Sequence, residues 1–321
     1  MIATIEVPEV AVGHSSSERP DTDQLVASAM SEESLRCLVT DGTESWEAEQ
    51  MPGEWKAAVT GAGSGVGREV ALQLARSNWS LSLADNNFDA LLDTQSECAA
   101  TTNTAHATHL DVTNRIEIDS WAASSRSALG GIDAVFNVAG VLYSGDVIDT
   151  PPADFDLVMA TNFESVVNSS RAFLPDILKS RRGRIVNVSS AFGVMSAPGY
   201  SAYNASKFAV RGFTEALNQE LRLASRTARA TCVIPGGLKT SIARTARAAP
   251  GVDHARTADF FDSRIARTTP EVAARKIIAG AWRGKSQVTI GNDARLVTAT
   301  TRVLGPQYQR LLPSLQALRR T

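Results

Sequence analysis

A tyrosine and a lysine, Tyr203 and Lys207, stand four residues apart in the sequence Tyr-Asn-Ala-Ser-Lys. Four residues make about one turn of an α-helix, so the two side chains would lie on the same helix face. An ammonium held beside a phenol favours the phenolate and lowers the phenol pKa from about 10 toward neutrality. Such a pair can act as a general acid or base, although the same spacing also occurs by chance in exposed helical pairs.

A second stretch with chemical potential is rich in glycine and runs from Gly61 to Gly67. It follows an apolar run, residues 55–60, that suits a buried strand, and it precedes an amphipathic stretch that ends near Ser77. In a strand, glycine turn and helix of this kind, backbone N–H groups at the helix N-terminus can bind a pyrophosphate. A tight turn without a ligand is the alternative.

A carboxylate, Asp85, ends the next predicted strand, 18 residues after Gly67. A dinucleotide-binding fold places an acid at about this distance, where it binds the hydroxyls of the adenine ribose. A carboxylate there would repel a 2′-phosphate, and neither Asn86 nor Ser64 offers a cation to receive one. We therefore expect NAD as the preferred cofactor, with NADP possible because Arg68 lies near the phosphates.

Taken in order along the chain, these features resemble the motifs of the short-chain dehydrogenase/reductase superfamily in its single-domain form. The resemblance extends from about residue 55 to residue 240. It implies an NAD(P)-dependent oxidoreductase that transfers a hydride between nicotinamide and a secondary alcohol or ketone. The motifs that carry it are Thr60-Gly61-x-x-x-Gly65-x-Gly67, Asn137-Val138-Ala139-Gly140 and Tyr203-x-x-x-Lys207.

The resemblance also implies a catalytic set around the tyrosine. Ser190, 13 residues before Tyr203, matches the catalytic serine, and on a strand its neighbour Ser189 would point the other way. Asn162 matches a helix asparagine that holds a water between the lysine and the solvent; the alternative is a buried amide with satisfied hydrogen bonds. Tyr200 is left with a substrate contact. The implied catalytic residues are Asn162, Ser190, Tyr203 and Lys207.

The same resemblance assigns the residues that would bind the cofactor. Asp111 would meet the adenine amino group or, alternatively, only cap the next helix. A Pro-Gly segment after the strand at 230–234 would hold the nicotinamide carboxamide, and Lys207 would contact the nicotinamide ribose. The implied set is Thr60, Gly61, Ser64, Gly65, Val66, Gly67, Asp85, Asp111, Val112, Asn137, Ala139, Gly140, Tyr203, Lys207, Pro235, Gly236, Leu238 and Thr240.

Strand-like and helix-like segments must alternate if these residues are to meet. They do so after residue 55, which predicts a Rossmann-like, doubly wound parallel α/β sheet with helices on both faces. The predicted strands are residues 55–60, 81–85, 108–112, 132–138, 183–190, 230–234 and 287–290, the one at 132–138 being central. The predicted helices are residues 65–77, 87–100, 153–179, 201–224 and 269–280.

Individual apolar residues are expected to face the sheet from two of these helices. In the helix at 87–100 they are Leu91 and Leu92. In the helix at 201–224 they are Phe208, Phe213 and Leu217, which would hold the tyrosine and lysine rigidly in place.

The chain divides by charge into an acidic front and a mildly basic body. Residues 1–50 contain eleven acidic and two basic residues (net −9), whereas residues 51–321 contain 23 acidic and 30 basic residues (net +7). We expect a poorly ordered, dispensable extension over 1–50, one domain over 51–295 with a substrate lid at about 241–268, and a basic amphipathic segment over 296–321. Few charges near the lid favour an apolar substrate.

Several classes of protein are disfavoured by composition. Three cysteines, far apart and odd in number, argue against a disulfide framework, and no apolar run approaches the ~20 residues of a membrane span. His106 and His109 would point to opposite faces of a strand, so no metal site is expected.

We expect a cytoplasmic homodimer or homotetramer without a nucleic-acid partner. A non-catalytic dinucleotide sensor or scaffold is the alternative, against which the complete catalytic set weighs.

Overall fold

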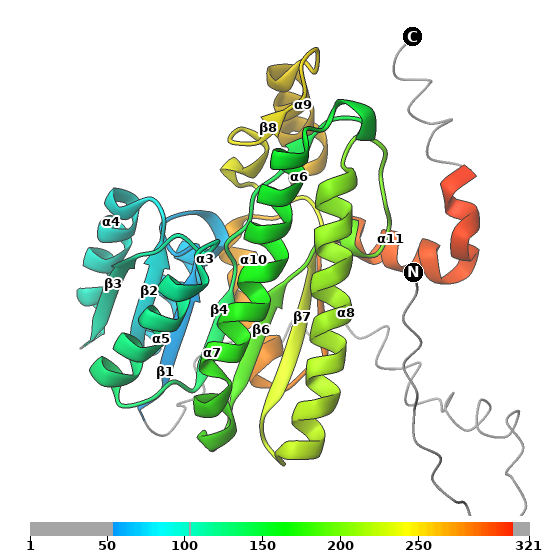
Figure 1. The fold of residues 1–321 in the computed structure, drawn as a ribbon. Coiled ribbons are helices and arrows are strands. Elements are labelled where there is room, and N and C mark those ends of the chain that lie inside the picture. The colour runs from blue at the N-terminus through cyan, green and yellow to red at the C-terminus, as the bar shows by residue number, and fades with distance from the viewer. Residues whose placement is uncertain (1–53, 103, 311–321) are drawn as a thin grey trace, which may run out of the picture. The chain divides into compact units, whose positions relative to one another are not determined.

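A seven-stranded parallel sheet forms the centre of the molecule (Figure 1). The computed structural model describes residues 54–102 and 104–310. The strand order is β3-β2-β1-β4-β6-β7-β9, so β4 is central, as predicted. The strands are β1 (Lys56–Thr60), β2 (Ser80–Asp85), β3 (Ala105–His109), β4 (Ala134–Asn137), β6 (Arg184–Val188), β7 (Arg229–Pro235) and β9 (Gln287–Ile290).

Helices cover both faces of this sheet, which confirms the doubly wound α/β fold (Figure 1). On one face α5 (Arg115–Leu129) packs against α7 (Ser165–Lys179), and α8 (Ser201–Ala224) lies beside α7. On the other face α3 (Gly65–Arg76) packs against α10 (Pro270–Trp282), with α4 (Phe88–Ala99) next to α3. The remaining helices are α6 (Pro152–Met159), α9 (His254–Phe260) and α11 (Asn292–Leu304).

Short helical turns connect several of these elements. They are 3₁₀ turns, except for η2 and η5, which are π-helical. Their bounds are η1 (Val147–Asp149), η2 (Ala160–Glu164), η3 (Ala191–Gly193), η4 (Ser241–Ala243), η5 (Phe261–Ile265) and η6 (Gly305–Gln307).

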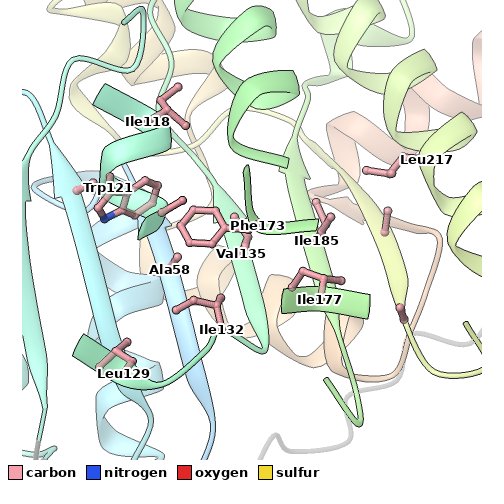
Figure 2. Packing of buried hydrophobic residues seen from close by; sticks show 14 of the residues in the cluster. Ala58, Ile118, Trp121, Leu129, Ile132, Val135, Phe173, Ile177, Ile185 and Leu217 are labelled. Atoms are coloured by element: carbon pink, nitrogen blue, oxygen red, sulfur yellow. The ribbon is translucent and has the colours of Figure 1, made fainter. Parts of the chain in front are cut away.

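A buried apolar cluster fills the space between the sheet and the helices α5, α7 and α8 (Figure 2). At its centre the ring of Trp121 meets the ring of Phe173 edge to face, with centroids 5.0 Å apart. Ile185 on β6 and Val135 on β4 contribute side chains from the sheet. Burying this face fixes the ends of β4 and β6, which carry the residues of interest, relative to α7 and α8.

Helix boundaries follow from the capping residues in the sequence. The side chain of Asn114 accepts hydrogen bonds from the backbone N–H groups of the first turn of α5, and Gly130 ends that helix with φ +70°. Thr269 accepts from the N–H of Val272, and Pro270 opens α10. The predicted α10 therefore begins where these signals place it.

Two apolar residues that were expected to face the sheet are exposed instead. Leu91 is 0% exposed, but Leu92 is 41% exposed, contrary to the expectation that both face the sheet. Phe208 is 40% exposed and does not belong to the core face of α8, whereas Leu217 does. The reason is geometric: successive helical residues point about 100° apart, so the neighbour of an inward residue turns outward.

The third strand and the long helix at 153–179 differ clearly from the predicted elements. The third strand ends at His109 rather than near Val112, because the N–H of Thr113 bonds to the Asp111 carboxylate and turns the chain toward α5. The long helix predicted at 153–179 is interrupted by the π-helical turn η2, which separates α6 from α7.

The segment predicted as a substrate lid forms η4, β8 (Arg247–Ala248), α9 and η5. Strand β8 pairs in parallel with β5 (Tyr143–Ser144), and Arg247 forms an ion pair with Asp154 of α6 at 2.9 Å. These contacts attach the segment to the body beside α6 (Figure 1).

Other sequence expectations concern the ends of the chain. The predicted extension over 1–50 and residues 311–321 of the predicted basic segment over 296–321 lie outside the described residues. Within the part of the chain that the structure describes, no helix has both the length and the apolar content needed to cross a membrane.

Candidate active site

The end of strand β6 presents two serines whose side chains diverge. The hydroxyl of Ser189 is buried and donates to the backbone carbonyl of Lys207 at 2.7 Å. Ser190 opens the turn η3, where its Oγ accepts from the N–H of Phe192 at 3.1 Å, and its side chain also bonds to Tyr203. As expected, only one of the two serines faces the tyrosine, and it is Ser190.

Helix α8 carries Tyr203 and Lys207 on one face, one turn apart. The Lys207 ammonium lies 5.6 Å from the centroid of the Tyr203 ring and donates to the carbonyl oxygen of Val188 at 3.0 Å. Lys207 is only 4% exposed, so its charge is held away from water. Ser190, Tyr203 and Lys207 therefore form one cluster between the end of β6 and the start of α8.

Proton affinities in this cluster are set mainly by burial. Burial raises the pKa of Tyr203 above its usual value, and the hydrogen bond from Ser190 opposes this rise. Burial lowers the pKa of Lys207 to about 8, with a small opposing contribution from Cys232. The direction for Tyr203 is opposite to the lowering expected from Lys207: burial is the main effect on the phenol, and the Lys207 ammonium donates to the Val188 carbonyl oxygen.

Asn162 lies in the π-helical turn η2 and is fully buried. Its side-chain carbonyl accepts from the N–H of Val141 at 2.8 Å, while its amide donates to the Val141 carbonyl at 2.9 Å and to Ser206 Oγ at 3.1 Å. The side chain is thus a buried amide with its hydrogen bonds satisfied. It ties the loop after β4 to helix α8, one residue before Lys207.

The glycine turn between β1 and α3 requires its glycines for reasons of space. Gly61 has φ +69° and Gly65 has φ +51°, conformations that favour glycine. A Cβ on Gly67 would lie 2.0 Å from the carbonyl oxygen of Gly61. The turn is therefore closed tightly upon itself at the N-terminus of α3.

Hydrogen bonds join the ends of the central strands at this turn. Thr60 Oγ1 accepts from the N–H groups of Val138 at 3.1 Å and Ala139 at 3.3 Å. Asn137 donates to Asn187 Oδ1 at 2.8 Å and so links β4 to β6. Across the same loop, a Cβ on Gly140 would lie 3.5 Å from the Lys207 ammonium. The glycine turn and the catalytic cluster are thus neighbours.

Asp85 lies beside the glycine turn, at the end of β2. Its carboxylate accepts from the N–H of Gly63 and from the N–H of Asn87, both at 2.9 Å. Arg68 bonds to Glu97 and lies 3.6 Å from Glu69. The carboxylate is therefore oriented by the turn itself, while the nearby arginine is already engaged by acids.

Asp111 and Val112 follow β3 at the edge of the sheet, two strands from β1. One carboxylate oxygen of Asp111 accepts from the N–H and the hydroxyl of Thr113. These bonds hold the turn before α5, whose cap is Asn114 rather than Asp111, and Val112 packs against the core cluster. These two residues are not drawn into the catalytic cluster.

The Pro235-Gly236 segment follows β7 and contacts the start of α11. The Asp293 carboxylate accepts from the N–H of Gly237 at 2.6 Å, and a Cβ on Gly236 would lie 2.1 Å from it. Thr240, a few residues later, lies against the glycine turn, since a Cβ on Gly65 would be 3.3 Å from its methyl group. Leu238 forms an isolated bridge with Thr268.

An open cavity of about 550 Å³ lies where the glycine turn meets the segment after β7. Gly65 and Arg68 line it from the side of α3, and Thr240 and Arg244 line it from the opposite side. Ser190, Tyr203 and Lys207 are not among its lining residues. The cavity therefore adjoins the glycine turn rather than the cluster of Ser190, Tyr203 and Lys207.

Three residues of the site were not foreseen from the sequence. Asp293 holds the turn after β7, Ser206 bonds to Asn162, and the Phe192 ring lies edge-on to Tyr203 with centroids 6.2 Å apart. Only Asp293 carries a local signal, as an acid in the first turn of a helix after glycine. The other two come together only through the tertiary structure.

Comparison with known proteins places this geometry in a family. The family model for "short chain dehydrogenase" matches residues 56–251. "Putative oxidoreductase SadH" of Mycobacterium tuberculosis is 42% identical over 256 residues, covering 80% of this chain and 93% of that protein. "Estradiol 17-beta-dehydrogenase 11" of Mus musculus is 29% identical over 255 residues, covering 79% of this chain and 81% of that protein.

Solved structures agree with these sequence relatives. The crystal structure of a short chain dehydrogenase/reductase from Burkholderia phymatum, in complex with NAD, has a TM-score of 0.73 and 27% identity to this chain. The match covers 80% of this chain and 95% of that chain. The family match over more than half the sequence, together with the arrangement of the glycine turn and of Ser190, Tyr203 and Lys207, shows that the chain belongs to the short chain dehydrogenase family of oxidoreductases.

Proposed function

We propose that this protein catalyses reversible hydride transfer between a nicotinamide dinucleotide and a secondary alcohol or ketone. The observation that carries the proposal is the cluster of Ser190, Tyr203 and Lys207 beside the loop after β4. The hydroxyls of Ser190 and Tyr203 bond to each other there, and the Lys207 ammonium lies 5.6 Å from the centroid of the Tyr203 ring. This arrangement serves a reaction in which charge develops on one substrate oxygen.

The N-terminus of α3 fits the pyrophosphate of such a cofactor. Ser64 stands at the N-cap without a side-chain capping bond, and the first turn contains no acidic residue. The positive end of the helix dipole is therefore not offset locally, which favours a bound anion. Gly65 lines the open cavity of about 550 Å³ and puts no side chain into it.

Each residue of the cluster has a defined part in the proposed reaction. When bound, the nicotinamide would supply or accept the hydride. Ser190 and Tyr203 would bind the substrate oxygen, and Tyr203 would donate its proton to that oxygen as the ketone is reduced. The raised pKa of Tyr203 keeps the phenol protonated in the free enzyme, as a proton donor requires.

Lys207 and Asn162 support these two hydroxyls. In the proposal, the Lys207 ammonium contacts the nicotinamide ribose and stabilises negative charge that forms on the Tyr203 oxygen. Asn162 holds Val141 and Ser206 in place through its side chain. A proton path to the solvent would therefore need water bound by groups other than the already occupied Asn162 amide.

The preferred cofactor in this proposal is NAD rather than NADP. The Asp85 carboxylate, held by the N–H groups of Gly63 and Asn87, lies where an adenine ribose would bind. It would accept from ribose hydroxyls and repel a 2′-phosphate. Arg68 is engaged by Glu97 and Glu69, so its charge is partly offset. The Burkholderia phymatum relative, which was solved with NAD, supports the same choice.

An apolar substrate is the class that the surroundings of Tyr203 favour. The Phe192 ring lies between Tyr203 and Tyr200, with centroids 6.2 Å and 5.5 Å away. The name of the relative "Estradiol 17-beta-dehydrogenase 11" places estradiol in the set of compounds to test. Such a surface contributes affinity through burial of the substrate rather than through charge.

Replacement of Tyr203 by phenylalanine tests the proposal. We expect Tyr203→Phe to bind NADH with nearly unchanged affinity and to reduce ketones about 10²- to 10⁴-fold more slowly, because the proton donor is lost. Turnover is followed by NADH absorbance with a panel of aliphatic, aromatic and steroid ketones, and the panel is repeated with NADPH.

The matched control is Tyr200→Phe, which removes a phenol hydroxyl from the same aromatic group. This variant should keep kcat within a few-fold of the parent and change at most the KM of the substrate. If Tyr203→Phe reduces ketones at the parental rate, the mechanism is wrong. If the unaltered protein binds NADH but turns over no ketone, the protein is a sensor or scaffold.

A further inference from the structure

A groove lined by seven arginines lies at the amino ends of β6 and β7, opposite the end of the sheet that carries Ser190, Tyr203 and Lys207. Its volume is about 550 Å³. Strand β6 begins in it with Arg184 and β7 begins in it with Arg229, whereas Ser190 follows the other end of β6. The lining arginines are Arg181, Arg182, Arg184, Arg222, Arg226, Arg229 and Arg283.

The groove is built from three segments far apart in sequence. Residues 181–184 precede and open β6, residues 222–229 connect α8 to β7, and Arg283 follows α10. In Figure 1 this is the end of the molecule at which α8 finishes. A five-residue strand spans about 15 Å, so the groove is separate from the site around Tyr203.

Five of the seven arginines have no carboxylate partner among the described residues. No ion pair formed within residues 54–102 and 104–310 includes Arg182, Arg184, Arg222, Arg226 or Arg229. Arg181 and Arg283 are not counted here. The other five arginines bring five positive charges to one small groove, and none of the five forms an ion pair with an acid of residues 54–102 and 104–310.

Backbone carbonyls hold the deepest of these arginines in place. Arg184 is 5% exposed, and its guanidinium donates to the carbonyl oxygens of Ala281, Gly183 and Thr227. Arg229 donates to carbonyls of the loop after α8. The guanidinium groups are thus fixed before any ligand arrives, and a preorganised site loses less side-chain entropy on binding.

Helix ends explain only part of this collection of arginines. Arg222 lies in the last turn of α8 and Arg283 caps α10, and cations near a helix C-terminus are stabilised by its dipole. Each helix C-terminus carries roughly half a negative charge, so two of them offset about one positive charge. The five positive charges of the arginines counted above are far more than two helix C-termini offset.

Repulsion among the arginines affects the pKa of Arg184, which is buried. Burial, together with the smaller effect of the neighbouring charges of Arg182 and Arg229, lowers the pKa of Arg184 to about 10. A structure that only had to fold would gain from an acid at this position. The uncompensated charge instead favours a ligand that brings its own negative charges.

We propose that this arginine groove binds a small anion that carries two or more phosphate groups. Guanidinium forks match phosphate oxygens in pairs, and several of them converge here on a concave space of the size that small ligands occupy. A free polyphosphate and a phosphorylated lipid headgroup share this chemistry; the small volume of the groove, about 550 Å³, favours the free anion.

The test is calorimetric titration of the full chain with sodium tripolyphosphate. We expect saturable binding that weakens as salt is added. The double variant Arg222→Gln, Arg226→Gln should bind at least about tenfold more weakly, since it loses the charge-assisted hydrogen bonds of two guanidinium groups. Both arginines are exposed and lie outside the catalytic cluster, so ketone reduction should stay unchanged.

A matched double variant, Arg115→Gln, Arg171→Gln, removes the same charge from exposed helix positions elsewhere and should bind the anion like the parent. Repeating the titration with NADH present keeps the glycine turn occupied. The proposal is overturned if tripolyphosphate does not bind, or if both double variants lose binding equally. It is also overturned if phosphatidylglycerol vesicles or an oligonucleotide, but not tripolyphosphate, bind through Arg222 and Arg226.

Discussion

At the scale of single residues, the catalytic cluster is governed by burial. Lys207 loses almost all contact with water and is compensated by one carbonyl, that of Val188. Tyr203 keeps its proton more firmly than a free phenol, although the Ser190 hydroxyl bonds to it. Without a cofactor, the free enzyme therefore has a neutral phenol, and an ammonium that loses its proton near pH 8.

This protonation pattern predicts how NADH binding depends on pH. Burial lowers the pKa of Lys207 to about 8, so the ammonium is charged below that pH and neutral above it. If the charged form binds the cofactor, NADH affinity should be constant below pH 8 and should fall as the pH rises through about 8, approaching tenfold for each further pH unit. Fluorescence titration of NADH across this range measures it.

The control for this prediction is Lys207→Met, which removes the titrating group while keeping a long apolar side chain. In this variant the affinity for NADH should be lower and should show no step near pH 8. A parental affinity that stays constant from pH 7 to well above pH 8 would contradict the assignment.

At the scale of elements, two irregular turns position the chemistry. The π-helical turn η2 interrupts the helix that precedes α7 and directs Asn162 toward Val141 and Ser206. The glycine turn between β1 and α3 closes on itself, because no side chain fits between Gly67 and Gly61. Regular helix and strand geometry alone would place neither group, and π-turns of this kind recur at functional sites.

Gly67→Ala should therefore damage both the turn and cofactor binding. Its new Cβ would lie 2.0 Å from the Gly61 carbonyl oxygen, so backbone atoms would have to move. We expect destabilisation by about 1–3 kcal/mol and an increase of at least about tenfold in the KM for NADH, with a smaller change in the KM for the ketone. Urea unfolding and steady-state kinetics measure these effects.

Gly212→Ala provides the comparison within the same protein. Gly212 lies inside helix α8, and a Cβ there would meet no atom within 4 Å. This variant should be more stable by about 0.5–1 kcal/mol, since glycine is unfavourable in a helix, and its kinetics should be unchanged. Equal behaviour of the two variants would show that the glycine turn is not tight.

At the scale of the whole molecule, the carboxyl ends and the amino ends of the strands carry different groups of residues. The carboxyl ends of β1 and β4 meet where the strand order reverses, and there the glycine turn and the catalytic cluster lie together. The amino ends of β6 and β7 carry the arginine groove. A β5–β8 pair and the Arg247–Asp154 ion pair hold the proposed lid near α6.

The family match, which begins at residue 56, bears on the acidic residues 1–50. We predict that a chain beginning at Met51 folds and reduces ketones with kcat and KM within a few-fold of the full chain, because every residue of the proposed mechanism follows β1. Thermal unfolding and ketone kinetics of the two chains check this. Loss of both folding and activity would show that the first fifty residues are integral.

The sequence alone determined the order of elements and the type of chemistry. Periodicity and caps located the strands and helices to within a few residues, as with Thr269 and Pro270 at α10. The glycine turn, Asp85, Ser190, Tyr203 and Lys207 could be recognised because each belongs to a short local motif, whose spacing is fixed by one turn, one strand end or one helical turn.

Only the tertiary structure decided how these groups affect one another. Which of Leu91 and Leu92 faces the core, and whether Lys207 points at the phenol or at Val188, depends on packing between segments far apart in sequence. The pKa of Tyr203 and the gathering of arginines from three loops depend on it as well. Burial and proximity are properties of the folded chain, and local sequence patterns do not contain them.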